Sequence, residues 1–256
     1  MFYNPYMRND QPGSVGQMMY YNGHSDYIID CKTGDVNGDR VPDSVCTVGH
    51  RPQDLSSPFV EDIAILIQDG ATHKYTRIPL KENMGYNPTV FLGDFTGDKV
   101  DDILVSIDSG GSGGFSYDYV YSFVNNKPRL LFDSEAFSEK YKYQVNYMDY
   151  YKVEVISDVF KERFIIDISG RGKEYLSAIY NPNGTLKAPL QGDVIPMGNV
   201  YPVDYQRDGL YELNVIQRII GQYNADTLGW LNTYLKWNDK EFEPTMQNVT
   251  IFGNPL

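Results

Sequence analysis

This 256-residue sequence contains no long apolar run, and that absence argues against membrane-spanning helices. Its longest apolar stretches, such as IAILI at 63–67, have the length of a strand, whereas a membrane helix needs about 18 apolar residues. The first residues also lack the basic and apolar regions of a secretory signal peptide. We therefore expect no membrane insertion, and we expect synthesis in the cytoplasm.

Basic residues, cysteines and histidines are all scarce. Lys and Arg number 22 against 34 Asp and Glu, so the net charge is −12, which argues against a basic face that tracks nucleic-acid phosphates. Two cysteines are too few for a disulfide scaffold. The three histidines, His24, His50 and His73, show no metal-ligand spacing. We therefore expect no nucleic-acid partner.

Helical periodicity is nearly absent, and the composition favours strands. The chain has 22 Tyr and 12 Phe together with 23 Gly and 14 Pro, which suits short strands joined by tight turns. The stretch FSYDYVYSF at 115–123 alternates with the period of a strand. One short helix is expected over 134–143, with Ser134 as its N-cap. We predict an all-β chain in which residues 1–26 form a polar arm leading into the first strand and residues 27–256 form a single domain.

Acidic residues concentrate in short loops that repeat along the chain. One such loop lies in the segment GDVNGDRVPD, and its positions are counted from Asp35 as position one. Positions one, three, five and nine are then Asp35, Asn37, Asp39 and Asp43. The pattern recurs 59 residues later, where the four positions are held by Asp94, Thr96, Asp98 and Asp102. A weaker copy holds them with Asp204, Gln206, Asp208 and Glu212. The chain therefore contains an unevenly spaced internal repeat.

A second regularity supports this alignment without using the acidic residues. Small residues stand four places before position one and eleven places after it, in the pairs Cys31 and Cys46, Val90 and Val105, Val200 and Val215. If each loop is the tip of a hairpin, the members of a pair face each other across antiparallel strands. A degenerate copy around Asp167 breaks both rules, because Arg171 stands where an acidic residue is expected. We predict no metal at that copy.

The spacing in these loops suits calcium, a hard cation that takes six to eight oxygen ligands. Alternate residues of a curled loop turn toward one point, and position seven offers a backbone carbonyl, here of Val41, Val100 or Leu210. Gly38 and Gly97 stand where the loop must turn tightly or adopt a positive φ. The alternative is an ordinary hairpin turn in which each side chain bonds its own backbone. We expect calcium at the first two loops, with the third as a weaker match.

These loops differ from an EF-hand, which needs Gly at position six, a bidentate Glu at position twelve and flanking helices. The pattern Asp-x-(Asn/Asp/Thr)-Gly-Asp-x-x-x-Asp between strands instead resembles the FG-GAP or VCBS repeat of integrin α-chain propellers. The resemblance implies a β-propeller with about four strands to a blade and calcium in the acidic hairpin loops. Since only four or five blades fit into 256 residues, the expected fold is β-propeller-like, irregular or incomplete.

Two other motifs carry less weight. GGSGG at 110–114 matches the Gly-x-Ser-x-Gly elbow of serine hydrolases, but an elbow enters a helix and this segment enters the aromatic stretch 115–123. All three histidines also precede Ser112, which is the wrong order for such an enzyme. Cys31 and Cys46 either form a disulfide or lie as free, small apolar residues, and the matching valine pairs favour the second interpretation.

These inferences favour a non-enzymatic, calcium-stabilised, β-propeller-like module with a structural or interaction role. Its partner would be a protein or a polysaccharide. The alternative is a hydrolase or lyase that acts on cell-wall or polysaccharide material through paired carboxylates outside the loops. Because weak calcium sites stay empty in resting cytosol, we expect the chain to act where calcium is plentiful, at the cell surface or, given its many tyrosines, in a spore layer.

Overall fold

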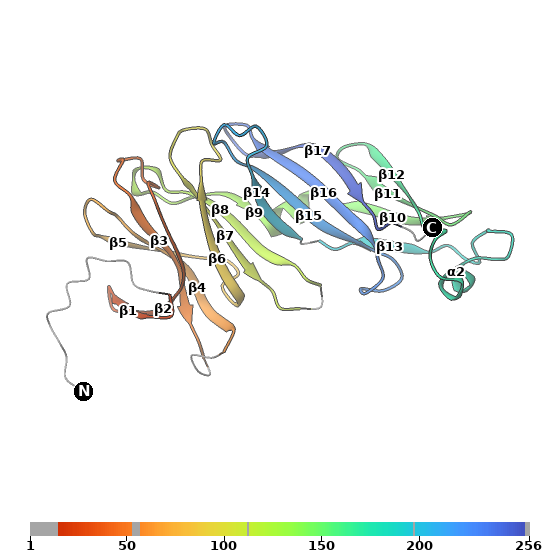
Figure 1. The fold of residues 1–256 in the computed structure, drawn as a ribbon, viewed down its shortest axis with the longest axis horizontal. Coiled ribbons are helices and arrows are strands. Elements are labelled where there is room, and N and C mark those ends of the chain that lie inside the picture. Colours follow the sequence, from red (N-terminus) through yellow and green to blue (C-terminus); the bar gives the residue numbers. More distant parts are fainter. Residues whose placement is uncertain (1–14, 53–56, 112, 197, 254–256) are drawn as a thin grey trace. The chain divides into compact units, whose positions relative to one another are not determined.

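Strands dominate the computed structural model, which describes residues 15–52, 57–111, 113–196 and 198–253 (Figure 1). Strands hold 54% of the described residues and helices hold 7%, so the predicted all-β fold is confirmed. The strands form two sheets, of nine and of eight strands. Within the described ranges no helix is long and apolar enough to cross a membrane.

The first sheet runs almost in chain order. Its strands pair in the order β1-β2-β3-β4-β6-β7-β8-β9, and β5 pairs with β4. β2 to β5 and β6 to β9 therefore form two groups of four in which successive strands pair, an arrangement compatible with propeller blades. The strands are β1 (Met18–Tyr21), β2 (His24–Gly34), β3 (Asp43–His50), β4 (Phe59–Gln68), β5 (Tyr75–Pro79), β6 (Gly85–Gly93), β7 (Asp102–Asp108), β8 (Ser116–Ser122) and β9 (Arg129–Asp133). A 3₁₀ turn, η1 (Val124–Asn126), joins β8 to β9.

The second sheet departs further from chain order. Its order is β12-β11-β10-β13-β15-β16-β17, and β14 pairs with β15, so that β14 to β17 form a third group of four. The strands are β10 (Tyr143–Met148), β11 (Lys152–Ser157), β12 (Glu162–Asp167), β13 (Gln191–Val194), β14 (Asn199–Val203), β15 (Glu212–Ile220), β16 (Thr227–Trp237) and β17 (Phe242–Thr250).

Short α-helices precede and follow the strands β10 to β12. α1 (Ser134–Lys140) lies in the segment predicted to be helical, but its N-cap is Asp133, whose carboxylate accepts hydrogen bonds from two N–H groups of the first turn. The sequence pattern does not predict α2 (Lys173–Ile179). Tyr175, Leu176 and Ile179 lie at helical spacing and pack against the core of unit 2. The helix has only seven residues, however, and its N-cap, Gly172, provides no side-chain cap.

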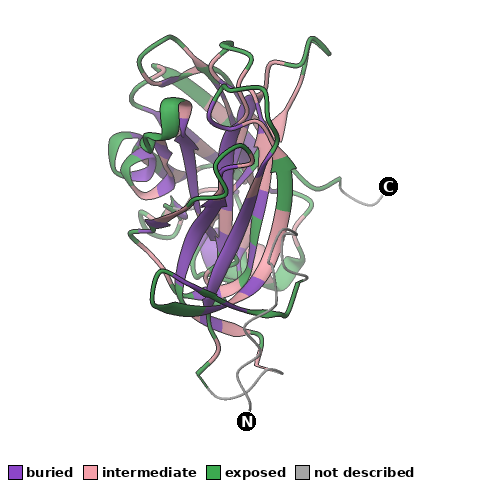
Figure 2. Cartoon of the chain, turned by 90° about the vertical axis from the view of Figure 1, so that its left-hand side faces the viewer, coloured by how far each residue is buried: buried purple, intermediate pink, exposed green. Residues whose placement is uncertain are grey.

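Contacts divide the chain into two compact units, each with its own apolar core. Unit 1 comprises residues 1–110, 117–131 and 206–211, and unit 2 comprises residues 111–116, 132–205 and 212–256. Buried side chains gather on the strands, whereas the connecting loops are mostly exposed (Figure 2). That residues 27–256 form a single domain stays a prediction.

The predicted arm contains β1 and the first residues of β2. Residues 1–14 lie outside the described residues, and β1 and β2 begin at Met18 and His24. Met19 and Tyr21 of β1 are buried in an apolar cluster with Ile28 of β2. Part of the segment expected to be an arm therefore adds a strand to the first sheet.

The predicted cross-strand pairs are confirmed. Antiparallel strands place Cys31 opposite Cys46, Val90 opposite Val105, and Val200 opposite Val215. The three hairpins therefore share one register, as the alignment predicts.

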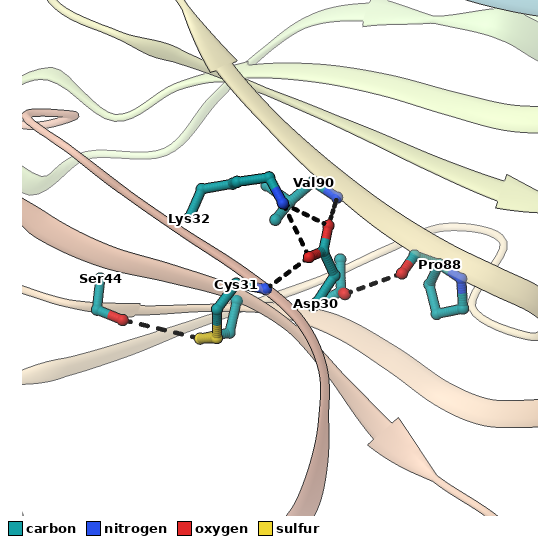
Figure 3. The surroundings of a disulfide bond; sticks show 8 residues. Asp30, Cys31, Lys32, Ser44, Pro88 and Val90 are labelled. Atoms are coloured by element: carbon teal, nitrogen blue, oxygen red, sulfur yellow. Dashed lines mark hydrogen bonds and ion pairs between the residues drawn. A yellow bond between two sulfur atoms is a disulfide. The ribbon is translucent and has the colours of Figure 1, made fainter. Parts of the chain in front are cut away.

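Cys31 and Cys46 form a disulfide, which corrects the prediction of two free apolar residues. Their Cα atoms lie 4.1 Å apart because the two residues face each other across β2 and β3. The matching valine pairs show only that small side chains fit at this position, so they do not distinguish a disulfide from free thiols. Figure 3 shows the neighbouring Asp30 carboxylate, which accepts hydrogen bonds from the N–H groups of Cys31 at 2.9 Å and Val90 at 3.0 Å. The disulfide and this carboxylate tie β2 to β3 and to β6.

Candidate metal site in the acidic loops

The acidic residues lie at the tips of three hairpins. Loop 1 (residues 35–43) follows β2, loop 2 (residues 94–102) follows β6, and loop 3 (residues 204–212) follows β14. Each loop therefore joins the first two strands of a four-stranded group. Residues 206–211 of loop 3 belong to unit 1, together with loops 1 and 2.

The three loops share one backbone conformation at two positions. Position four is left-handed in each loop, with φ of 86°, 81° and 58° at Gly38, Gly97 and Arg207. Position six is left-handed as well, with φ of 68°, 67° and 86° at Arg40, Lys99 and Gly209. Loop 3 thus makes the same turn as the other two, although its glycine stands at position six instead of position four.

The loops stack on one another through equivalent contacts. The N–H of Asp101, at position eight of loop 2, donates to the carbonyl of Asp35 in loop 1 at 3.0 Å. The N–H of Tyr211, at position eight of loop 3, donates to the carbonyl of Asp94 in loop 2 at 2.8 Å. The Tyr211 ring packs edge-on against Phe91, with ring centroids 5.0 Å apart. A change in one loop therefore reaches its neighbour.

In loop 1 the acidic side chains accept hydrogen bonds from the backbone of the loop itself. Asp35 accepts from the N–H groups of Gly38 and Arg40, both at 2.8 Å. Asp39 accepts from the N–H of Val41 at 2.7 Å. These bonds are ordinary hairpin chemistry. A carboxylate has about four acceptor sites, however, so each side chain still has lone pairs for a cation.

Loop 2 repeats this pattern and adds a buried oxygen. Asp94 accepts from the N–H groups of Gly97 at 2.6 Å and Lys99 at 2.8 Å. Thr96 Oγ1, at position three, is buried and makes no hydrogen bond of ordinary geometry with any described residue. Its hydroxyl lies near enough to Asp102 to lower the pKa of that carboxyl. A buried oxygen without a full partner costs free energy unless something else binds it, so Thr96 fits a cation ligand.

Position nine places a carboxylate inside the protein. The side chains of Asp43 and Asp102 belong to residues that are 0% and 1% exposed. Asp43 accepts from the N–H groups of Val36 at 3.0 Å and Gly70 at 2.9 Å, and Asp102 accepts from the N–H of Phe95 at 3.0 Å. These bonds hold the two buried carboxylates at the base of their loops.

Burial makes the charged forms of both carboxyls costly. It raises the pKa of Asp43, and the nearby Asp39 and Asp69 raise it further. It raises the pKa of Asp102 to about 7, with an added effect of two other carboxylates in loop 2. Among the described residues no Lys or Arg forms an ion pair with a carboxylate of loop 1 or loop 2. The negative charge of these loops therefore has no internal counter-ion in the described chain.

Loop 3 is more open. Asp208 accepts from the N–H of Leu210 at 3.0 Å, as the corresponding residues of the other loops do. Glu212 is buried and accepts from the N–H of Tyr205 at 3.4 Å. Position five is exposed in all three loops, but Gln206 at position three is exposed, whereas Asn37 is buried and Thr96 is half-buried.

The structure does not gather the predicted ligands around one point. The described residues contain no group of three or more His, Cys, Asp or Glu side chains that could hold a metal ion. In loops 1 and 2 the carboxylates face backbone N–H groups instead. In this conformation the carboxylates of loops 1 and 2 therefore do not form a preassembled metal site.

Two residues from other turns extend the polar cluster at loop 1. The side-chain amide of Asn37 donates to Asp69 at 3.5 Å and to Asn126 at 3.4 Å, and Asn126 donates to Asp69 at 3.2 Å. The backbone N–H of Thr72 lowers the pKa of Asp69. Sequence reasoning misses Asp69 and Asn126 because they lie 32 and 89 residues from Asn37. The Asp-Gly turn at 69–70 is the one signal that the sequence offers.

The degenerate copy has another role in unit 2. Arg171 forms an ion pair with the buried carboxylate of Asp226 at 3.2 Å. Tyr175 of α2 donates to the same carboxylate at 2.7 Å. Asp167 accepts from the N–H of Ser169 at 2.8 Å, within its own turn. The positive charge of Arg171 is therefore used to tie this turn and α2 to the segment before β16.

The GGSGG segment leads into β8. Ser112 itself lies outside the described residues. A nucleophile elbow requires a helix at this point, so the strand removes the geometric basis for a serine hydrolase.

Comparison with known proteins gives a family other than the one that the loops resemble. The model of the YybI C-terminal domain matches residues 141–250, most of which belong to unit 2. A curated relative from Bacillus subtilis (strain 168), the uncharacterized protein YybI, is 48% identical over 229 residues, which cover 90% of this chain and 87% of the relative. The assignment to the FG-GAP or VCBS repeats is therefore wrong. It rested on short Asp- and Gly-rich loops, which hairpin chemistry can produce in unrelated chains. The chain belongs to the YybI family.

Proposed function

We propose that this chain is a non-enzymatic structural or interaction module in which loops 1 and 2 each bind one calcium ion. The observation that carries the proposal is the pair of buried carboxylates, Asp43 and Asp102, that lack a cationic partner in the described chain. Thr96 Oγ1 beside Asp102 adds a buried oxygen to loop 2. The side chains and carbonyls that would hold the ions are those of Asp35, Asn37, Asp39, Val41 and Asp43, and of Asp94, Thr96, Asp98, Val100 and Asp102. A weaker third site would use Asp204, Gln206, Asp208, Leu210 and Glu212.

Calcium would supply the positive charge that the loops lack. Because loops 2 and 3 each donate a backbone hydrogen bond to the loop before them, an ion at one loop also favours the ordered form of its neighbour. Binding to the folded chain and not to the unfolded chain then raises stability with calcium concentration. In this proposal the metal is a structural clamp on the first sheet.

The disulfide bears on where the chain acts. Disulfides form and persist in oxidising surroundings and are rare in the cytosol. A calcium clamp of moderate affinity also needs surroundings rich in calcium. Both features support action outside the cytosol, at the cell surface or in a spore layer, with a protein or a polysaccharide as partner.

The test is thermal unfolding of the full chain in calcium and in chelator. We expect calcium at about 1 mM, the range of extracellular calcium modules, to raise the melting temperature by several degrees. Asp39→Asn keeps the acceptor for Val41 but removes a charge, and it should lose much of this response. Asp167→Asn is the matched control, because Asp167 also accepts from a backbone N–H two residues on. A melting temperature indifferent to calcium in the wild type would reject the proposal.

A further inference from the structure

Unit 2 contains a pocket that the acidic loops do not touch. Its volume is about 410 Å³, within the range of small-molecule sites. Strand register places several of its lining residues on one face of β14 to β17. Asn199 faces Ile216, Ile216 faces Asn232, Arg218 faces Trp230, and Trp230 faces Thr250. Facing residues of antiparallel strands project to the same side of a sheet. The pocket is therefore built on a rigid four-stranded platform.

Arg218 gives this pocket a positive charge. Its guanidinium donates to three neutral acceptors: Thr227 Oγ1 at 3.2 Å, Asn224 Oδ1 at 2.9 Å and the Gly113 carbonyl at 3.4 Å. Among the described residues it has no carboxylate partner, although the chain carries a net charge of −12. A half-buried guanidinium that is held in place without a counter-ion is suited to bind an anion.

Two side-chain amides provide further recognition. The Asn232 Nδ2 donates to Asn248 at 3.0 Å and to Thr250 at 2.9 Å, which fixes the amide and leaves its Oδ1 without a hydrogen bond in the described chain. Asn199 Oδ1 accepts from Ser116 at 3.3 Å, which leaves its Nδ2 as a donor. The pocket thus offers one acceptor and one donor beside a cation, a combination that suits hydroxyl groups.

Aromatic rings supply the apolar part of the lining. Trp230 and Tyr201 both line the pocket. The Trp230 ring contacts Phe252 edge-on, with centroids 4.7 Å apart, so its orientation is restrained. A flat ring beside polar groups is suited to a ligand that has an apolar face and a hydroxylated edge.

We propose that this pocket binds an acidic sugar, with the carboxylate of a uronic-acid residue on Arg218, the sugar ring on Trp230 and its hydroxyls on Asn199 and Asn232. The strong negative charge of the chain disfavours multiply charged phosphates, so a singly charged carboxylate is the better match for one arginine. The described lining contains no Asp or Glu, so the pocket lacks the pair of carboxyl groups that hydrolysis of a glycosidic bond uses.

The test is calorimetric titration of the full chain, at one fixed calcium concentration, with a tetrasaccharide that contains glucuronic acid. The matched ligand is the same tetrasaccharide with its carboxylates reduced to alcohols, which keeps the rings and removes the charge. Arg218→Gln removes the cation, and Arg163→Gln, an exposed arginine of the same unit, is the control variant. Adenosine monophosphate serves as the phosphate-bearing comparison.

We expect the acidic tetrasaccharide to bind at least about tenfold more tightly than the reduced one, and Arg218→Gln to lose this difference while Arg163→Gln keeps it. Equal binding of the two saccharides, tighter binding of the nucleotide, or no binding of the acidic saccharide up to about 10 mM would overturn the proposal. The ligand comparison uses the wild type, so it remains decisive if Arg218→Gln does not fold. The calcium proposal is independent of these outcomes, because its residues lie in the loops.

Discussion

Replacement of Asp102 by Asn tests whether this residue is a calcium ligand or an ordinary turn residue. Asparagine has nearly the shape of aspartate, and its Oδ1 can still accept the hydrogen bond from the Phe95 N–H. The substitution therefore removes the charge of a buried carboxyl while keeping its main structural contact. If Asp102 serves calcium, the variant gains stability without metal and loses the response to metal.

The magnitude follows from the pKa of Asp102, which burial raises from 3.8 to about 7 in the metal-free protein. A folded-state pKa above the unfolded value means that the folded chain holds the proton more tightly. The free energy of unfolding therefore falls as pH rises from about 4 to about 7 and stays level beyond that range. At 1.36 kcal/mol for each unit, the loss reaches up to about 4 kcal/mol in chelator.

The assay is urea unfolding of wild type and Asp102→Asn at pH 4 and pH 8, in chelator and in calcium. In chelator we expect similar stability at pH 4 and a more stable variant at pH 8. In calcium at pH 8 we expect the order to reverse, because the ion needs an anionic oxygen. A variant that is less stable than the wild type in chelator at pH 8 would refute the reasoning, since the charged carboxylate would then stabilise the turn by itself.

Three further predictions concern the loops and the core. Cys31→Val with Cys46→Val opens a disulfide that spans 15 residues, so the free energy of unfolding in urea should fall by about 3 kcal/mol, and an unchanged urea midpoint would contradict this. Asp226→Asn leaves Arg171 without its carboxylate, and the same assay should show a loss of about 3 kcal/mol, whereas a loss below about 0.5 kcal/mol would mean that the ion pair is not structural. Arg207→Gly relieves a left-handed non-glycine residue, so the melting temperature should rise by an amount equivalent to about 1 kcal/mol, and a decrease would speak against strain at position four.

The hairpins could be predicted in detail because their information is local. The spacing of Val90 and Val105 about loop 2 fixes a strand register without any knowledge of the rest of the fold, and the structure has that register. α2 could not be predicted in the same way, since three apolar residues within seven fit a short strand as well as a helix, and Gly172 at the N-cap gives no capping signal. The disulfide could not be predicted for a different reason. A small buried side chain at position 31 or 46 is compatible with a free thiol and with a disulfide bond.

The candidate sites could be predicted only where they lie within one loop. Loop 1 is contiguous in sequence, but Asp69 and Asn126 reach it from turns far along the chain, and only the folded sheet brings them there. The pocket at Arg218 and Trp230 likewise depends on the pairing of β15 with β16. A short acidic motif also misled the family assignment, since nine residues of turn chemistry do not identify the fold around them.

The most direct test of the calcium clamp is a count of bound ions by equilibrium dialysis and metal analysis of the folded chain. We predict about two calcium ions per chain at about 1 mM free calcium, and one fewer in Asp43→Asn and in Asp102→Asn. A wild-type chain that retains no calcium under these conditions would contradict the account. Loops 1 and 2 would then be held by their backbone hydrogen bonds alone.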